Sequence, residues 1–264
     1  MGKKLVIVGG GNLGTAIAEG LLKSKFSKAS EIIVTKRNVA TLNSLKERGI
    51  EVTDDNAAAV KKSEVIILAV KPFQVIEVLN TIKKELTGNK LIISVVTGVT
   101  INEIEGIIKK GLPVFRAMPN TAIAIQESMT CLCSKQANAA DIKYVHALFS
   151  TLGKVVTIDE KLMEAATILG ACGTAYAMRY IRANIQGGIE IGFDATTASL
   201  IAAQTVKGAA ELLLQKGTHP EQEIDKVTTP KGCTIAGLNE MEHQGFSSSL
   251  IKGIVASYKK IAKD

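Results

Sequence analysis

The chain has 264 residues, of which 46% are hydrophobic and 22% charged, so it is a globular protein with room for one large or two modest domains. Its net charge of +7 is uneven, because residues 1–158 carry 21 Lys and Arg against 13 Asp and Glu, whereas residues 159–264 carry 11 against 12. The basic residues are spread out, without the interleaved aromatic side chains typical of nucleic-acid-binding surfaces. We therefore expect no nucleic-acid partner, and a small polyanion bound by the first part of the chain.

The first apolar run, Leu5–Val8, predicts a buried parallel strand that leads directly into three spaced glycines, Gly9, Gly11 and Gly14. In this pattern the first glycine permits a tight turn and the second lets a pyrophosphate approach the backbone. The third lets the following helix pack closely against the strand. A second apolar strand, Glu31–Thr35, completes a βαβ unit of about 30 residues. This context favours a dinucleotide site over a glycine-rich turn of no function.

The end of the second strand favours NADP over NAD. A NAD site usually has an acidic residue about 20 positions after the glycines, where it binds the ribose 2′-hydroxyl. This sequence has Thr35-Lys36-Arg37-Asn38 there, with no acid. Because an arginine can bind a phosphate through two hydrogen bonds, these residues suit a 2′-phosphate. We predict NADPH as the cofactor and NADH as a weaker alternative, unless Lys36 and Arg37 are only solvated surface residues.

Strands and helices continue to alternate up to about residue 158. We predict one helix over residues 40–48 that ends at Gly49, another that begins at Pro72, and a third over residues 141–151. Further strands are expected at residues 64–70, 90–96, 113–117, 129–133 and 155–158. This alternation is typical of an α/β fold. It predicts a Rossmann-type, doubly wound sheet of seven or eight strands in a dinucleotide-binding domain over residues 1–158.

The pattern changes after Asp159, beyond which no further convincing strand occurs. Residues 160–186, 195–216 and 246–262 predict long helices rich in Ala, Leu and Ile, whose apolar residues extend broadly around each helix. A domain of about 100 residues cannot easily bury such helices alone. We therefore predict that residues 159–264 form an all-helical substrate and dimerisation domain that packs against a second subunit.

The sequence favours neither a metal site nor a membrane-spanning segment. The four cysteines form no CxxC pair and the three histidines form no HExxH motif, so we expect no metal site and reduced, buried cysteines. The chain opens with Lys3 and Lys4 before a strand, not with a signal peptide. Its longest notable uncharged stretch, Ala165–Met178, is too short to span a bilayer. We expect a soluble protein of the cytoplasm.

In an open α/β sheet, ligands bind beyond the carboxyl ends of the strands, so the residues that follow each strand are candidates. Singly, Lys71-Pro72 could be a plain helix start and Pro119-Asn120 a plain turn. Together they favour a cofactor crevice that includes Asn120. These candidate segments are residues 9–14, 35–38, 69–72, 96–98 and 117–121.

A second candidate site is the polar loop Asp225–Leu238, which opens into a helix. Hydroxyls and free amides in such a loop can bind an anion such as a carboxylate. The alternative is a structural role, in which Thr228, Thr229 or Thr234 caps the helix.

The chain resembles pyrroline-5-carboxylate reductases over nearly its full length. That family reduces 1-pyrroline-5-carboxylate to L-proline with NAD(P)H, the last step of proline synthesis. The resemblance implies a Rossmann domain followed by a helical domain that interlocks with that of a second subunit, often within a pentamer of dimers. The stretches that carry the resemblance are the glycine loop and residues 69–72, 94–100, 116–121 and 225–238.

The resemblance also implies roles for individual residues. It places the substrate near Glu160, Lys226, Cys233 and Thr234. Amides of residues 232–235, beginning with Gly232, would hold the substrate carboxylate, and the Thr234 hydroxyl would bond the imine nitrogen as the catalytic group. The residues placed against the cofactor are Gly9, Gly10, Gly11, Asn12, Leu13, Thr35, Asn56, Ala69, Val70, Lys71, Pro72, Val95, Val96 and Thr97.

Two departures from the family fall on the substrate side. Residues 230–234 read Pro-Lys-Gly-Cys-Thr, where the family usually has Pro-Gly-Gly-Thr-Thr. Residues 170–176 read Gly-Ala-Cys-Gly-Thr-Ala-Tyr, where it usually has Ser-Gly-Ser-Gly-Pro-Ala-Tyr. The departures leave two alternatives open. One is another NADP-linked imine or hydroxy-acid reductase, with Lys231 as its acid or base. The other is a non-catalytic NADP-binding protein.

Overall fold

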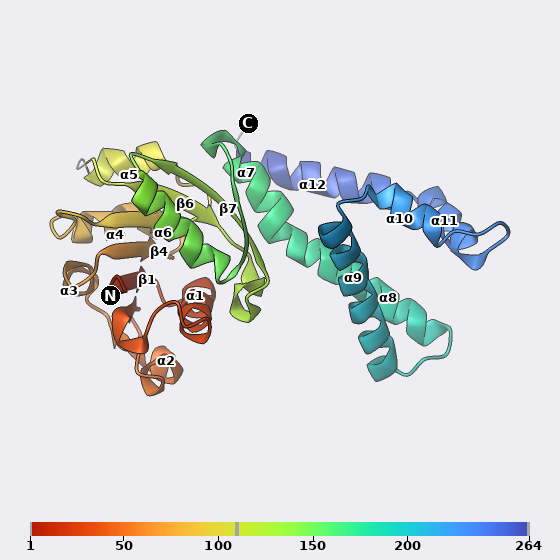
Figure 1. Cartoon of the computed structure of the whole chain (residues 1–264), viewed down its shortest axis with the longest axis horizontal. Coiled ribbons are helices and arrows are strands. Elements are labelled where there is room, and N and C mark those ends of the chain that lie inside the picture. The colour runs from red at the N-terminus through yellow and green to blue at the C-terminus, as the bar shows by residue number, and fades with distance from the viewer. Residues whose placement is uncertain (1, 109–110, 263–264) are drawn as a thin grey trace. The chain divides into compact units, whose positions relative to one another are not determined.

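The computed structural model describes residues 2–108 and 111–262, and the chain divides into two compact units, Met1–Cys172 and Gly173–Asp264 (Figure 1). The division follows residue 172, whereas we predict a domain boundary after residue 158. Residues just beyond 158 stay with the first unit because Met163 is fully buried in the core on one face of its sheet. Among the described residues, no helix has the length and apolarity needed to cross a membrane.

An eight-stranded sheet forms the centre of the first unit, in the order β3-β2-β1-β4-β5-β6-β7-β8. Adjacent strands are parallel, except that β7 runs antiparallel to β6. The predicted Rossmann-type α/β fold is confirmed. The strands are β1 (Leu5–Val8), β2 (Ile32–Thr35), β3 (Glu51–Thr53), β4 (Val65–Leu68), β5 (Leu91–Ser94), β6 (Val114–Met118), β7 (Ser128–Lys135) and β8 (Gly153–Thr157).

Helices cover both faces of this sheet, because successive residues of a buried strand point to opposite sides. In β1, Leu5 and Ile7 join the core beneath α1, α2 and α6, whereas Val6 and Val8 join the core beneath α3, α4 and α5. The helices of the first unit are α1 (Asn12–Lys23), α2 (Asn43–Glu47), α3 (Asn56–Lys61), α4 (Val75–Ile82), α5 (Ile101–Ile108), α6 (Ala139–Ser150) and α7 (Met163–Ala166).

Several predicted boundaries differ from the observed ones. The strands expected at 64–70 and 90–96 end earlier, at Leu68 and Ser94. Leu68 pairs with Val8 on one side and with Ser94 on the other, and β1 ends at Val8 because the glycine turn follows it. The helix expected over 40–48 is a 3-10 turn followed by α2. The helix expected at Pro72 likewise begins as a 3-10 turn before α4.

The second unit is entirely helical in its described part. Helices over 195–216 and 246–262 are confirmed, whereas the helix expected over 160–186 is broken. This segment instead comprises a 3-10 turn, α7 and a π-helical stretch at Thr167–Cys172, which belong to the first unit, and then α8, which begins the second. The Thr167 hydroxyl donates to the carbonyl of Met163 at 2.8 Å, a back-bond that competes with regular α-helix. The helices are α8 (Gly173–Glu190), α9 (Ala195–Lys216), α10 (Pro220–Lys226), α11 (Cys233–His243) and α12 (Phe246–Ala262).

The helical unit buries little of its own apolar surface. Ala198 and Ala202 are its buried hydrophobic residues within the described part of the chain, whereas Leu200 and Leu214 are each 70% exposed. A groove of about 710 Å³ between α8 and α9 is lined mainly by apolar side chains. Such a surface is typical of an element that packs against another subunit.

Candidate functional site

A crevice of about 670 Å³ opens at the carboxyl ends of β1, β2, β4 and β5. It lies where the strand order reverses between β1 and β4, the position at which open α/β sheets bind ligands. All but two of the predicted cofactor residues line it. These are Gly9, Gly11, Asn12, Leu13, Thr35, Lys36, Arg37, Asn56, Ala69, Val70, Lys71, Pro72, Val95, Val96 and Thr97.

The glycine loop has the shape that a pyrophosphate requires. Gly9 has a φ of 115°, and a Cβ there would lie 2.5 Å from the carbonyl oxygen of Ala69. A Cβ on Gly14 would clash directly with the carbonyl oxygen of Gly9. A Cβ on Gly11, in contrast, would have no neighbour within 4 Å. Gly11 is also the N-cap of α1 and gives it no side-chain cap, so the first amides of the helix face open space that suits an anion.

The other two predicted cofactor residues, Gly10 and Asn120, do not line the crevice. The Gly10 amide donates to the carbonyl of Thr35 at 2.7 Å, and a Cβ on Gly10 would lie 2.9 Å from the Leu42 side chain. Asn120 accepts from the amide of Ala122 at 3.0 Å, which caps a 3-10 turn. Both residues therefore have a clear structural role, and their contact with the cofactor stays a prediction.

Lys36 and Arg37, which follow β2, line the crevice, and an acidic residue that we did not predict accompanies them. Asp54, which follows β3, lines the crevice with Lys36 and Arg37. Sequence reasoning missed it because β3 has only three half-buried residues and no clear period. Among the described residues, neither Lys36 nor Arg37 forms an ion pair.

Glu160, a predicted substrate residue, takes part in a partly buried ion-pair network of the first unit. Arg116, whose side chain is 1% exposed, donates from Nη1 to Glu160 at 3.1 Å and from Nη2 to Glu164 at 3.0 Å. The amide of Ile101, at the start of α5, donates to the same Glu160 oxygen at 2.7 Å. Burial raises the pKa of the neighbouring Cys133 thiol to about 11, so this cysteine is a neutral core residue at pH 7. The contact of Glu160 with substrate stays a prediction.

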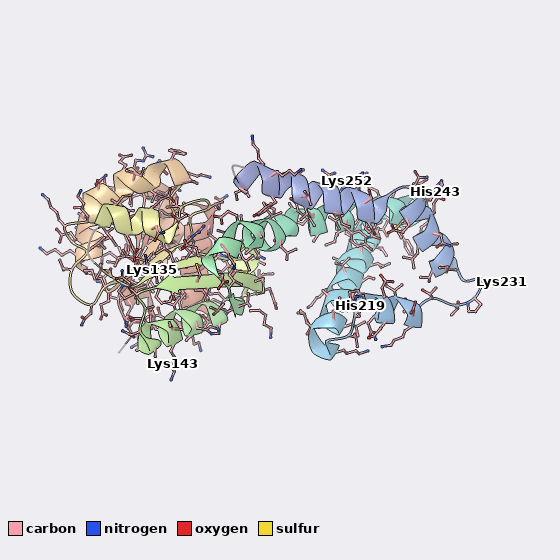
Figure 2. The ribbon with its side chains drawn as sticks, turned by 90° about the horizontal axis from the view of Figure 1, so that it is seen from above. Lys135, Lys143, His219, Lys231, His243 and Lys252 are labelled. Atoms are coloured by element: carbon pink, nitrogen blue, oxygen red, sulfur yellow. The ribbon has the colours of Figure 1, made fainter. Side chains whose placement is uncertain are left out.

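The remaining predicted substrate residues lie where α10 and α11 meet in the helical unit: Lys226 ends α10, Gly232 lies on the loop, and Cys233 and Thr234 begin α11. Lys226 bonds to Glu223 at 2.6 Å, and this bond, more than any other contact, lowers the pKa of Glu223. Lys231 lies on the turn that joins the two helices (Figure 2) and has a φ of 59°. Because glycine adopts this left-handed conformation without steric cost, the glycine usual in the family fits the position better than lysine.

Among the residues that the structure describes, no threonine caps α11. Its N-cap is Gly232, which provides no side-chain hydrogen bond, while the Thr228 hydroxyl donates to the carbonyl of Ile224 at 2.8 Å. Within the described part of the chain, the half-buried Thr234 hydroxyl has no hydrogen-bond partner. Cys233 begins the helix and is exposed, so the expectation of buried cysteines is wrong for this residue, and Cys131 and Cys172 are only partly buried. The first turn of α11 is therefore able to bind an anion through its amides.

The histidines and cysteines do not form a metal site in the described residues, where no group of three His, Cys, Asp or Glu side chains lies close enough to hold an ion. The His219 ring instead accepts from the amide of Glu221 at 3.3 Å and caps α10. Figure 2 shows His219 and His243 on separate helical segments of the second unit.

Comparison with known proteins covers both units. Residues 160–264 match the family model "Pyrroline-5-carboxylate reductase dimerisation", and residues 4–98 match "NADP oxidoreductase coenzyme F420-dependent". Pyrroline-5-carboxylate reductase 2 of Dictyostelium discoideum is 44% identical over 277 residues, which cover 99% of this chain and 93% of the relative. The chain belongs to the pyrroline-5-carboxylate reductase family.

Two further members of this family are informative. Pyrroline-5-carboxylate reductase 1 of D. discoideum is 48% identical over 98% of this chain, which spans about half (49%) of that relative's length. The crystal structure of Plasmodium falciparum pyrroline carboxylate reductase with NADP bound matches this chain with a TM-score of 0.88 and 28% sequence identity. The match covers 98% of this chain and 96% of the chain in that crystal structure. These findings confirm the predicted family and support the predicted class of NAD(P)H-dependent oxidoreductase with NADP as cofactor.

Gly11 and Gly14 have separable roles, which a pair of alanine variants tests. Gly14→Ala should lower the free energy of unfolding by about 1–3 kcal/mol, because its Cβ forces α1 away from β1. Gly11→Ala should leave the melting temperature nearly unchanged and weaken NADPH binding by about tenfold or more, because its Cβ enters the space of the pyrophosphate. Thermal melts and fluorescence titrations measure both. Unimpaired NADPH binding by Gly11→Ala would contradict this assignment of the crevice.

Proposed function

We propose that this chain catalyses the NADPH-dependent reduction of 1-pyrroline-5-carboxylate to L-proline, the last step of proline synthesis, in the cytoplasm. The proposal rests on a crevice with open space for a pyrophosphate at Gly11, in a chain that matches pyrroline-5-carboxylate reductases over nearly its whole length. The residues that would hold NADPH are the glycine loop and the segments that follow β2, β4 and β5.

The reaction asks for positioning more than for acid or base strength. NADPH, when bound, supplies a hydride from C4 of its nicotinamide ring. The acceptor is the imine carbon of the substrate, and a protonated cyclic imine is already strongly electrophilic. The C=N double bond becomes single, and its electron pair stays on the ring nitrogen. Because no difficult proton transfer is needed, most of the rate comes from proximity and orientation.

The loop between α10 and α11 is suited to hold the substrate. The amides of residues 232–235 would bind its carboxylate, which the uncapped N-terminus of α11 favours electrostatically. The Thr234 hydroxyl, without another partner among the described residues, would bond the imine nitrogen. Lys226 and Cys233 of the same unit are proposed to line this substrate site, and a substrate contact of Glu160 is proposed separately.

Assays with several substrates distinguish this proposal from its two alternatives. NADPH oxidation is followed in parallel with pyrroline-5-carboxylate, piperideine-6-carboxylate and a panel of hydroxy acids. We expect the highest kcat/KM with pyrroline-5-carboxylate. A preference for another imine or a hydroxy acid, with a pH–rate profile that Lys231 controls, would favour the alternative reductase. NADPH binding without turnover of any imine would favour a non-catalytic protein.

The family model of the second unit indicates self-association, and we propose that the unit of assembly is a homodimer, which can combine further into a pentamer of dimers. The exposed apolar side chains of the helical unit, such as Leu200 and Ile251, support this proposal. Light scattering at micromolar concentration should give at least twice the monomer mass. A folded monomer with full activity would contradict the proposal.

Thr234→Val tests the catalytic role of the threonine because it keeps the shape of the side chain and removes the hydroxyl. We expect kcat/KM to fall by about ten- to a thousandfold, since a hydrogen bond made mainly in the transition state is lost. NADPH affinity should stay unchanged, because the cofactor residues belong to the other unit.

The matched control is Thr234→Ser, which retains the hydroxyl and should retain most of the activity. A melting temperature is measured for both variants, because a purely structural threonine would lower stability by about 1 kcal/mol and leave turnover intact. That pattern in Thr234→Val would contradict the catalytic role.

A further inference from the structure

Asp54 is an acidic side chain placed beside the basic residues of the cofactor crevice. Thr53, the last residue of β3, lies in register with Thr35, the last residue of β2. The amide of Lys36 donates to the carbonyl of Thr53 at 3.0 Å. Asp54 and Lys36 therefore follow two adjacent parallel strands, which are about 5 Å apart. Both side chains, together with Arg37, line the same crevice.

Asp54 has no evident structural role in the described part of the chain. Its side chain is exposed, and among the described residues its carboxylate has no hydrogen-bond or ion-pair partner. The next residue, Asp55, is also exposed but has a structural role. It is the N-cap of α3, accepts from the amide of Ala58 at 2.9 Å, and does not line the crevice. The two aspartates thus have the same charge and adjacent positions but separate surroundings.

We propose that Asp54 reduces the preference for NADPH over NADH by opposing the charges of Lys36 and Arg37. Its carboxylate accepts a hydrogen bond from a ribose hydroxyl of the adenosine and repels a 2′-phosphate, which the two basic side chains attract. An acid at the end of β2 usually makes that hydroxyl contact in NAD sites. In this chain β3 supplies the acid instead, while β2 supplies the cations. The inference rests on the proposed function, because it takes NADPH as the cofactor of this crevice.

The charges explain why Asp54 reduces the preference for NADPH over NADH without reversing it. Lys36, Arg37 and Asp54 together carry one net positive charge, so a 2′-phosphate is still attracted. The same three groups offer NADH an acceptor for its 2′-hydroxyl. Removing only the carboxylate charge should therefore strengthen NADPH binding and weaken NADH binding at the same time.

The test compares Asp54→Asn with Asp55→Asn, since each variant removes one negative charge and asparagine still caps α3 well. Dissociation constants are measured by calorimetry for NADPH and NADH and for the fragments 2′,5′-ADP and 5′-AMP, at low and at high salt. In Asp54→Asn we expect the ratio of the NADH constant to the NADPH constant to rise about three- to tenfold at low salt. The fragment ratio should rise similarly, and the effect should shrink at high salt.

In Asp55→Asn both ratios should stay within about twofold of the starting protein, because that side chain lies outside the crevice. Unchanged ratios in Asp54→Asn, or equal shifts in both variants, would overturn the inference. Melting temperatures show that each variant is folded. No imine is present in these titrations, so their outcome is independent of turnover. If the protein reduces the imine but Asp54→Asn leaves the ratios unchanged, only this inference is refuted. If Asp54→Asn shifts the ratios but the protein does not reduce the imine, only the proposed function is refuted.

Discussion

The close packing of α1 against β1 is the contact on which the rest of the first unit depends. It exists because Gly14 lacks a Cβ, which would otherwise clash with the carbonyl oxygen of Gly9. The contact holds the N-terminus of α1 at the end of β1, beside β4, where the order of the strands reverses. The open space at Gly11 and the amides of the first helical turn follow from the same geometry. One backbone contact thus creates the anion site that the proposed chemistry needs.

A second set of contacts fixes the segment beyond the sheet. The buried Arg116 on β6 binds Glu160 and Glu164, and the side-chain amide of Asn120 donates to the carbonyl of Gly170 at 3.1 Å. These bonds tie the π-helical stretch and the residues before it to the carboxyl edge of the sheet. This packing explains why the first compact unit extends to residue 172, although the matched dimerisation domain begins at residue 160.

The sequence predicts the features that depend on local patterns. Apolar runs identify the central strands, and the spaced glycines identify the crevice, because burial on both faces and close backbone approach each restrict residue type. Features set by tertiary contacts escape prediction. The short strand β3 has no apolar run, so Asp54 was missed. The break at Thr167 coincides with a hydroxyl back-bond to Met163, and Gly10 lies against Leu42. The substrate residues came from the family resemblance, and they stay predictions.

Direct hydride transfer is the measurement that tests the central claim most directly. The chain is incubated with pyrroline-5-carboxylate and, in separate reactions, with each of the two forms of NADPH that carry deuterium on one face of nicotinamide C4. The product is then examined by NMR and mass spectrometry. We predict that one of the two forms yields L-proline with a single deuterium on the former imine carbon, and the other form yields unlabelled proline. The absence of proline, or unlabelled proline from both forms, would contradict the account.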